Sequence, residues 1–335
     1  MGSGIASTLR ARGYDMHVCD ARLEVASAFA SQGGIACTTP AEVGAACEVV
    51  ISVVVNAQQT DSVLFGDGGA AAAMKPGSVF IMCSTVDPNW SIALEARLAA
   101  LGIHYIDAPI SGGAAKAASG QMTVMSSARP EAYAKADAVL DAMAGKVYRL
   151  GDRAGVGSKV KIINQLLAGV HIAAAAEAMA LGLREGVAPG ALYEVITHSA
   201  GNSWMFENRM AHVLAADYTP LSAVDIFVKD LGAGHRARQQ VSAAAGIHRA
   251  PDVHAGVHGR LRPGGRQRRD QDLSGHRVAR PPVPAGRLRL SARRSSAFPC
   301  SGKNGSRSRN PRSRSRHSPP RVQLRSKACR CAAWR

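Results

Sequence analysis

The feature that most constrains the fold is an alternation of short apolar runs with amphipathic stretches over residues 1–152. The apolar runs are rich in β-branched residues, as buried strands are, and they cover residues 16–20, 49–55, 79–83, 103–107 and 122–125. The stretches between them have helical spacing, most clearly at residues 23–32, 90–101 and 131–143. Because strands that alternate with helices form parallel sheets, the sequence predicts an α/β domain with helices on both faces of the sheet.

A long Ala-rich apolar segment, residues 159–186, ends this alternation. It is too long for a strand, so we expect a helix that is buried on most faces and links the sheet domain to a helical one. Further helices are predicted at residues 189–199, which begin with a favourably placed proline, and at 204–215 and 221–231. The predicted domains are therefore 1–152 and an incomplete helical domain, 153–232.

The chain changes character near residue 233. Residues 233–335 contain 25 Lys and Arg against 3 acidic residues, whereas residues 1–232 contain 16 against 21. One hypothesis is a disordered tail that binds nucleic acid nonspecifically, by counterion release, with residues 306–320 resembling an Arg/Ser-rich segment. We favour a frameshift after about Gly232. Residues 264–272 can be encoded by codons that, read one base later, give Glu-Asp-Asp-Ser-Ala-Val-Ile-Lys, an acidic stretch of the kind expected near the C-terminus. A third hypothesis is a catalytically inactive remnant.

Cysteine usage and apolar run length indicate a protein of the cytoplasm. Four of the seven cysteines lie apart in residues 1–232, and no Cys-X-X-Cys pair suggests zinc or a disulfide framework. We expect every apolar run to be too short to span a bilayer, which needs roughly 20 residues. The first residues do not have the layout of a signal peptide. We therefore expect buried thiols, no metal and no membrane association.

A cofactor motif is indicated at the start of the chain. Gly2 opens an amphipathic helix, and Asp20 ends the strand that follows, 18 residues later. A Rossmann unit places there the acid that binds the ribose 2′-hydroxyl of NAD, and a carboxylate disfavours the 2′-phosphate of NADP, although Arg22 is close by. We expect that the chain begins at the last residues of a Gly-X-Gly-X-X-Gly loop and lacks the first strand.

A second motif follows the fourth predicted strand. Ser111, Gly112 and Gly113 come just after Asp107, at the carboxyl end of a strand, where α/β sheets bind ligands. The serine hydroxyl and the glycine N–H groups are suited to a carboxylate. The alternative is an ordinary Gly-rich turn.

The third motif lies on the long helix. Lys161, Asn164 and Gln165 share one face at i, i+3 and i+4. In an apolar helix, desolvation lowers the pKa of a lysine toward the range useful for acid/base catalysis. The alternative is a lysine that reaches solvent.

Together these motifs resemble the 3-hydroxyisobutyrate dehydrogenase family across residues 1–232, including residues 155–157, 176–178 and 229–231. The resemblance implies a Rossmann-type domain followed by a helical domain, NAD as cofactor, a small hydroxy-acid substrate and a homo-oligomer, dimer or tetramer. It implies that Lys161 is the acid/base and that the Ser111–Gly113 segment, Asn164 and Gln165 bind substrate. Residues near the cofactor would be Gly2, Asp20, Val54, Asn56, Thr85 and Lys229.

One position departs from the family pattern. The family usually has Asn-Asn where this chain has Asn164-Gln165, so the longer Gln165 side chain should shift any hydrogen bond to the substrate. Residues 164–171 and 200–209 most resemble the L-threonate dehydrogenase branch of the family. The implied activity is oxidation of a four-carbon sugar acid.

Overall fold

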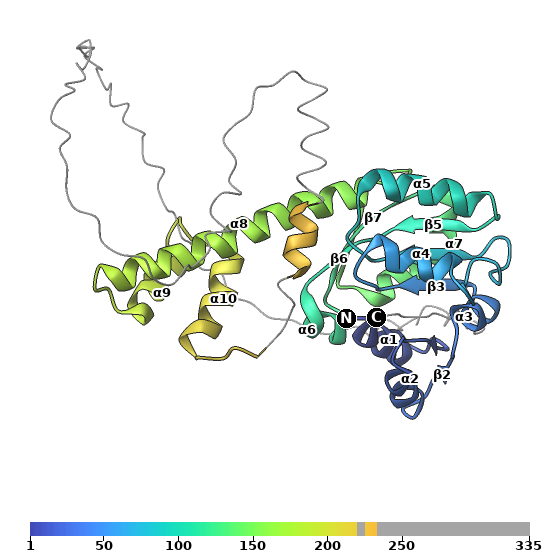
Figure 1. The fold of residues 1–335 in the computed structure, drawn as a ribbon, viewed down its shortest axis with the longest axis horizontal. Helices are drawn as coiled ribbons and strands as arrows, with labels where there is room; N and C mark the ends of the chain where they lie inside the picture. The colour runs from blue at the N-terminus through green and yellow to red at the C-terminus, as the bar shows by residue number, and fades with distance from the viewer. Residues whose placement is uncertain (220–224, 233–335) are drawn as a thin grey trace, which may run out of the picture. The chain divides into compact units, whose positions relative to one another are not determined.

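The computed structural model describes residues 1–219 and 225–232, which belong to one compact unit of the chain (Figure 1). All five predicted strands are present. The strands are β1 (His17–Val18), β2 (Ile35–Ala36), β3 (Val49–Ser52), β4 (Val79–Met82), β5 (His104–Asp107), β6 (Ile110–Ser111), β7 (Thr123–Ala128) and β8 (Lys146–Arg149).

The helices of the sheet region also match the predicted ones, and the structure adds α3, α4 and α6. They are α1 (Gly2–Ala11), α2 (Leu23–Ala30), α3 (Pro40–Ala46), α4 (Ala57–Phe65), α5 (Pro88–Ala99), α6 (Gly113–Ala118) and α7 (Pro130–Met143). The cysteines Cys19, Cys37, Cys47 and Cys83 are buried free thiols, as expected.

The strands form two hydrogen-bonded sheets. β1 and β2 pair in parallel, and the larger sheet has the order β3-β4-β5-β7-β6, with β8 beside β7. β3, β4 and β5 are parallel, but β7 is antiparallel to β5 and to β6, so the prediction of a parallel sheet needs correction there. The reason is local: β6 and the short helix α6, rather than a full crossover helix, connect β5 to β7. Within the described residues no strand joins the two sheets.

Alternate residues of each strand enter two separate cores, one on either face of the large sheet. Val49, Ile51 and Ile81 pack with side chains of α1, α2 and α7. Val50 and Phe80 pack on the other face with side chains of α3, α4 and α5. This two-sided burial explains why the strands are almost continuously apolar, and it confirms helices on both faces.

The second part of the described chain is helical. It contains α8 (Val156–Arg184), α9 (Pro189–Thr197), α10 (Trp204–Leu214) and a further helical segment at residues 225–232. α8 contacts β7 near its start, and α9 and α10 pack along it (Figure 1). The helices predicted at 189–199 and 204–215 are confirmed, and part of the one at 221–231 is seen.

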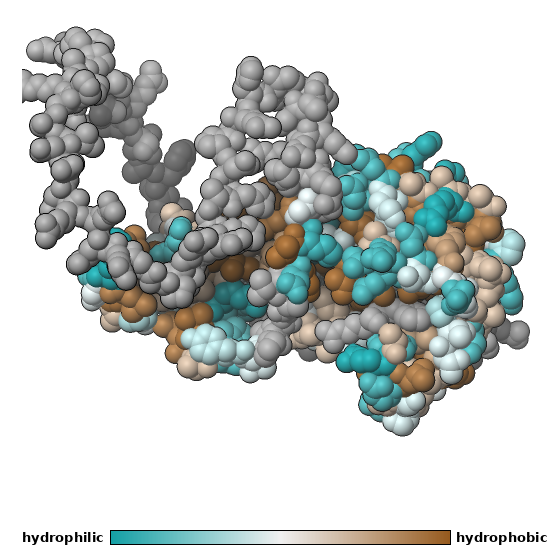
Figure 2. All heavy atoms as spheres, in the orientation of Figure 1, coloured by the Kyte–Doolittle hydropathy of each residue, from teal (hydrophilic) through white to brown (hydrophobic). Residues whose placement is uncertain are grey.

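Two expectations about α8 are wrong. It is not buried on most faces, because Ile163, Leu166 and Leu167 are more than half exposed, and apolar side chains lie exposed in this part of the surface (Figure 2). It is also, at 29 residues, long and apolar enough to cross a membrane by length and composition alone. Gly169 and Gly182 lie within the helix and do not break it, so the apolar segment predicted at residues 159–186 forms one continuous helix. The predictions for residues 233–335 lie outside the described residues.

Candidate active site

The start of α8 is fixed to the sheet by one buried carboxylate. Asp107, at the end of β5, accepts hydrogen bonds from the backbone N–H of Gly155 and of Ser158 (both 2.9 Å) and from the Ser158 hydroxyl (2.7 Å). Burial raises the pKa of Asp107, while the bonds from Ser158 and Gly155 lower it. The two backbone donors belong to the N-terminus of α8, where N–H groups have no partner within the helix and a carboxylate is favourable.

A glycine lets α8 approach the strands closely. A Cβ atom at Gly157 would collide with the carbonyl oxygen of Met125 and lie 2.9 Å from that of Asp107. The Gly157 N–H donates to the Ser127 hydroxyl at 2.9 Å. Since Lys161 is one helical turn farther along α8, this contact also sets the position of the lysine.

Lys161 is buried, with 6% of its surface exposed, so it does not reach solvent as a surface lysine would. Its Nζ donates to Oε1 of Gln165 at 2.8 Å, and Asn164 Nδ2 donates to the same oxygen at 3.1 Å. Burial lowers the pKa of the Lys161 ammonium to about 8; Asp230 opposes this shift and Lys229 adds to it. The structure therefore brings together the three predicted α8 residues, and the amine is set to exchange a proton near neutral pH.

A chain of polar contacts continues from Gln165 to the end of β4. Gln165 Nε2 donates to Oδ2 of Asp230 at 2.6 Å, and the other Asp230 oxygen is 2.6 Å from the Lys229 ammonium. Lys229 Nζ also donates to the carbonyl oxygen of Thr85 at 2.7 Å. Residues 225–232 thus connect α8 to the sheet edge where the cofactor residues were predicted.

The predicted substrate segment lies directly after Asp107. Ser111 is half-buried in β6, and Gly112 and Gly113 have φ values of +133° and +75°, which side chains rarely adopt. The glycines are therefore needed for the backbone path, as in the alternative of a Gly-rich turn. Lys116, in the helix that follows, lies 5.9 Å from the ring of Trp204 in α10.

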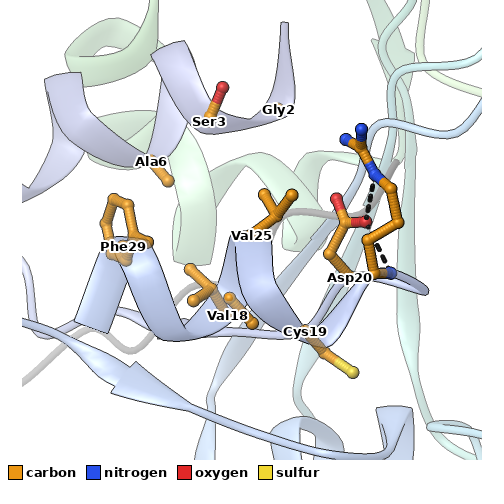
Figure 3. Close-up of a pocket in the computed structure, with 10 residues that line it drawn as sticks. Gly2, Ser3, Ala6, Val18, Cys19, Asp20, Val25 and Phe29 are labelled. Carbon is orange, nitrogen blue, oxygen red and sulfur yellow. Dashed lines mark hydrogen bonds and ion pairs between the residues drawn. The ribbon is translucent and has the colours of Figure 1, made fainter. Parts of the chain in front are cut away.

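The predicted cofactor residues near the N-terminus line a pocket between α1 and α2 (Figure 3). Gly2 lies in the first turn of α1 on one side, and Asp20 lies at the end of β1 on the other (Figure 3). One carboxylate oxygen of Asp20 accepts from the Arg22 N–H at 3.0 Å and is 3.6 Å from the Arg22 guanidinium. The other oxygen points toward α1 across the pocket, where a Rossmann unit would place the ribose of NAD (Figure 3).

The remaining predicted cofactor residues lie at the carboxyl ends of β3 and β4. Val54 is buried, and its carbonyl oxygen accepts from Ser84 at 2.7 Å. Asn56 caps α4 by accepting from Gln59 N–H at 2.8 Å. Since the carboxyl ends of parallel strands share one edge of a sheet, Val54, Asn56 and Thr85 lie along a single edge.

Sequence reasoning did not identify Asp107 or Asp230 as important to the site. Asp107 could have been found, because a carboxylate that ends an apolar strand needs a buried partner. Asp230 lies in the 229–231 stretch that carries the family resemblance, but its contact with Gln165, 65 residues away, could not be predicted. Among the described residues no cluster of histidine, cysteine and acidic side chains is suited to a metal ion.

Two family models match the chain in sequence. The NAD binding domain of 6-phosphogluconate dehydrogenase matches residues 1–151. The NAD-binding domain of NADP-dependent 3-hydroxyisobutyrate dehydrogenase matches residues 155–250. Both models describe NAD-binding domains of dehydrogenases, so the chain uses NAD or NADP.

Individual relatives point to the same family. The L-threonate dehydrogenase of Cupriavidus necator is 66% identical over 232 residues, covering 69% of this chain and 78% of the relative. The crystal structure of 3-hydroxyisobutyrate dehydrogenase from Salmonella typhimurium superimposes with a TM-score of 0.67 and 47% identity, covering 71% of this chain and 84% of that one. A Mycobacterium tuberculosis 3-hydroxyisobutyrate dehydrogenase with L-serine has a TM-score of 0.64 and 27% identity, covering 74% and 85%.

These matches confirm the fold class and support a dehydrogenase over a nucleic-acid-binding protein. The chain belongs to the 3-hydroxyisobutyrate dehydrogenase family of NAD(P)-dependent oxidoreductases, within its L-threonate dehydrogenase branch.

Proposed function

We propose that this protein oxidises L-threonate, or a similar four-carbon sugar acid, with NAD as its preferred cofactor and Lys161 as its acid/base. The observation that carries the proposal is the buried Lys161 amine, held by Gln165 on a helix fixed to the ligand-binding edge of the sheet. The 66% identity with the L-threonate dehydrogenase of Cupriavidus necator supports the choice of substrate.

The chain's own residues have two tasks in this reaction. The neutral Lys161 amine accepts the proton of the substrate hydroxyl, while Ser111, Gly112 and Gly113 bind the carboxylate and hold the carbinol carbon in place. NAD, when bound, supplies the acceptor for the hydride from that carbon, which becomes a carbonyl. Asn164 and Gln165 contribute amide groups beside the amine.

The preference for NAD is proposed from Asp20. Its carboxylate is suited to the ribose 2′-hydroxyl and repels a 2′-phosphate in the same place. Gly2, Val54, Asn56, Thr85 and Lys229 would contact other parts of the cofactor.

Turnover of the full chain tests the role of Lys161. We expect Lys161→Ala to lower kcat for NAD-linked oxidation of L-threonate by about 100-fold or more, with little change in NAD binding measured by fluorescence titration. The matched control is Lys159→Ala, because Lys159 is an exposed lysine on the same helix. Equal turnover of Lys161→Ala and Lys159→Ala would contradict the proposal.

The exposed side of α8 suggests the state of assembly. Ile163, Leu166, Leu167 and Val170 are exposed at i, i+3, i+4 and i+7, so they form one apolar stripe. Exposed apolar patches of this kind mark interfaces in soluble proteins. We therefore place a second copy of the chain on this stripe, in a cytoplasmic homo-oligomer.

A further inference from the structure

The side chain of Gln165 lies between two groups that have opposite hydrogen-bonding capacity. The Lys161 amine donates to Gln165 Oε1 at 2.8 Å, and Gln165 Nε2 donates to Asp230 Oδ2 at 2.6 Å. All three residues are buried, Asp230 to 1% exposure. An ionised carboxylate can only accept, so Asp230 allows a single orientation of the Gln165 amide.

That orientation matters for the neutral form of Lys161. A neutral amine has two N–H donors and one lone pair, and only the lone pair can accept a proton. When Gln165 Oε1 accepts one N–H, the amine cannot turn freely, and its lone pair has a restricted direction. The second donor to Oε1, Asn164 Nδ2 at 3.1 Å, keeps that oxygen in place.

The length of Gln165 is what makes this bridge possible. The amide of an asparagine would sit one methylene closer to α8, about 1.5 Å back. It could not stay within hydrogen-bond distance of both Lys161 and Asp230 without movement of the helical segment at 225–232. The Gln at position 165, where the family usually has Asn, therefore has a specific partner in Asp230.

We propose that Asp230 is a positioning residue, which acts through the Gln165 amide to orient the Lys161 amine toward the substrate hydroxyl. The inference rests on the proposed function of Lys161 and assigns a role to a residue outside the predicted site. Asp230 also links the Lys161 amine to the sheet edge that holds the predicted cofactor residues, because its carboxylate is paired with Lys229, which contacts Thr85.

The charge of Asp230 gives the proposal a measurable consequence. The charged groups that act on Lys161 are Asp230 and Lys229, both from residues 225–232, and Asp107 of β5 is bonded to Gly155 and Ser158 instead. Asp230 raises the pKa of Lys161 against the lowering effect of burial. Removal of the Asp230 charge should therefore lower the pKa of Lys161 further, not raise it.

The first test is the Asp230→Asn variant of the full chain, which is close to isosteric. We expect its plateau kcat to fall about 10-fold, because a misoriented amine is a poorer base. We expect the midpoint of the acidic limb of its pH profile to move down by about 1 pH unit, as loss of a nearby opposite charge predicts. The matched control is Asp225→Asn, since Asp225 is an exposed acid in the same helical segment and should change neither quantity.

A double-mutant cycle tests whether Asp230 acts through Gln165. Gln165→Asn should itself lower the plateau kcat, and Asp230→Asn should then cause less than a further twofold loss. Full additivity of the two losses would overturn the proposal. If Asp230→Asn does not fold, Gln165→Asn alone serves as the test. An unchanged plateau kcat in Gln165→Asn would then overturn the proposal.

A second readout does not depend on turnover. The ¹³Cε chemical shift of Lys161, assigned with Lys161→Met, reports the protonation of the amine directly. A lower titration midpoint in Asp230→Asn than in the unsubstituted chain supports the proposal, and an unchanged or higher midpoint overturns it. If the unsubstituted chain oxidises no hydroxy acid, the proposed function fails, but this titration still decides whether Asp230 controls Lys161.

Discussion

At the scale of single residues, the proposed roles of Asp20 and Lys161 depend on the groups within hydrogen-bond distance of each side chain. The proposed role of Lys161 as a base depends on burial, which lowers the pKa of its ammonium to about 8. In the proposed preference for NAD, Asp20 acts through the oxygen that faces the pocket, because the other oxygen accepts from the Arg22 N–H (Figure 3). Both effects come from atoms a few ångströms away and can be tested by single substitutions.

The substitution Asp20→Ser should weaken the preference for NAD. It removes the carboxylate that repels a 2′-phosphate and leaves the Arg22 guanidinium, 3.6 Å from the present carboxylate, free to pair with that phosphate. We expect the ratio of kcat/KM with NAD to that with NADP to fall by about 10-fold to 100-fold, as loss of a charge contact of about 1.5–3 kcal/mol predicts. Steady-state kinetics with each cofactor measure this ratio.

The control for this substitution is Asp15→Ser. Asp15 is an exposed acid just before β1, and it does not line the pocket between α1 and α2. It should leave the cofactor ratio unchanged. A ratio that is unaffected by Asp20→Ser would show that another residue selects the cofactor.

At the scale of elements, the site depends on how α8 begins. Gly157 allows the first turn of this helix to approach the carbonyl oxygens of β5 and β7. The substitution Gly157→Ala should force the helix outward and lower the free energy of unfolding by about 1–3 kcal/mol, as overpacking does. Urea unfolding followed by circular dichroism measures this change. Because Lys161 moves with the helix, kcat should fall as well.

Gly190→Ala provides the matched comparison. Gly190 lies in the first turn of α9, and nothing lies within 4 Å of an added Cβ. Alanine is the better helix former by about 1 kcal/mol, so this variant should be as stable as the original chain or slightly more stable. If both glycine variants unfold at the same urea concentration, the close approach at Gly157 is not important to stability.

Helices and strands could be predicted from the sequence where the spacing of apolar residues is regular along the whole element. The five apolar strands and the long helices have such runs, and the structure contains them. β2, β6 and α6 are too short to show a period. α3 and α4 carried a different signal, since Thr39 and Asn56 cap them by accepting backbone N–H groups at 3.3 Å and 2.8 Å. Caps of this kind precede helices and could have been used.

The parts of the candidate site that could be predicted are those whose residues lie close together in sequence. Lys161, Asn164 and Gln165 fall on one helical face by their numbering alone, and the structure joins them. The contact of Gln165 with Asp230 joins segments that are distant in sequence, and no periodicity reports such a contact. The exposure of α8 was mispredicted for a related reason: an apolar composition does not reveal which surface covers it.

At the scale of the whole molecule, the proposed homo-oligomer can be tested at the apolar stripe of α8, formed by Ile163, Leu166, Leu167 and Val170. We expect Leu167→Glu to shift the protein from a dimer or tetramer toward monomers in sedimentation-velocity experiments, because it places a charge within the stripe. Leu101→Glu is the control, since Leu101 is an exposed leucine outside α8 and should leave the sedimentation coefficient unchanged. A chain that sediments as a monomer before any substitution would contradict the assigned interface.

The most direct test of the account is the pH dependence of kcat/KM for L-threonate oxidation by the unsubstituted chain. Lys161 accepts a proton only as the neutral amine, so kcat/KM should rise with pH and level off above the pKa of Lys161. Because burial lowers that pKa from 10.5 to about 8, the account predicts a single limb with its midpoint near pH 8. A midpoint near 10.5, or the same limb retained in Lys161→Ala, would contradict the assignment of Lys161 as the acid/base.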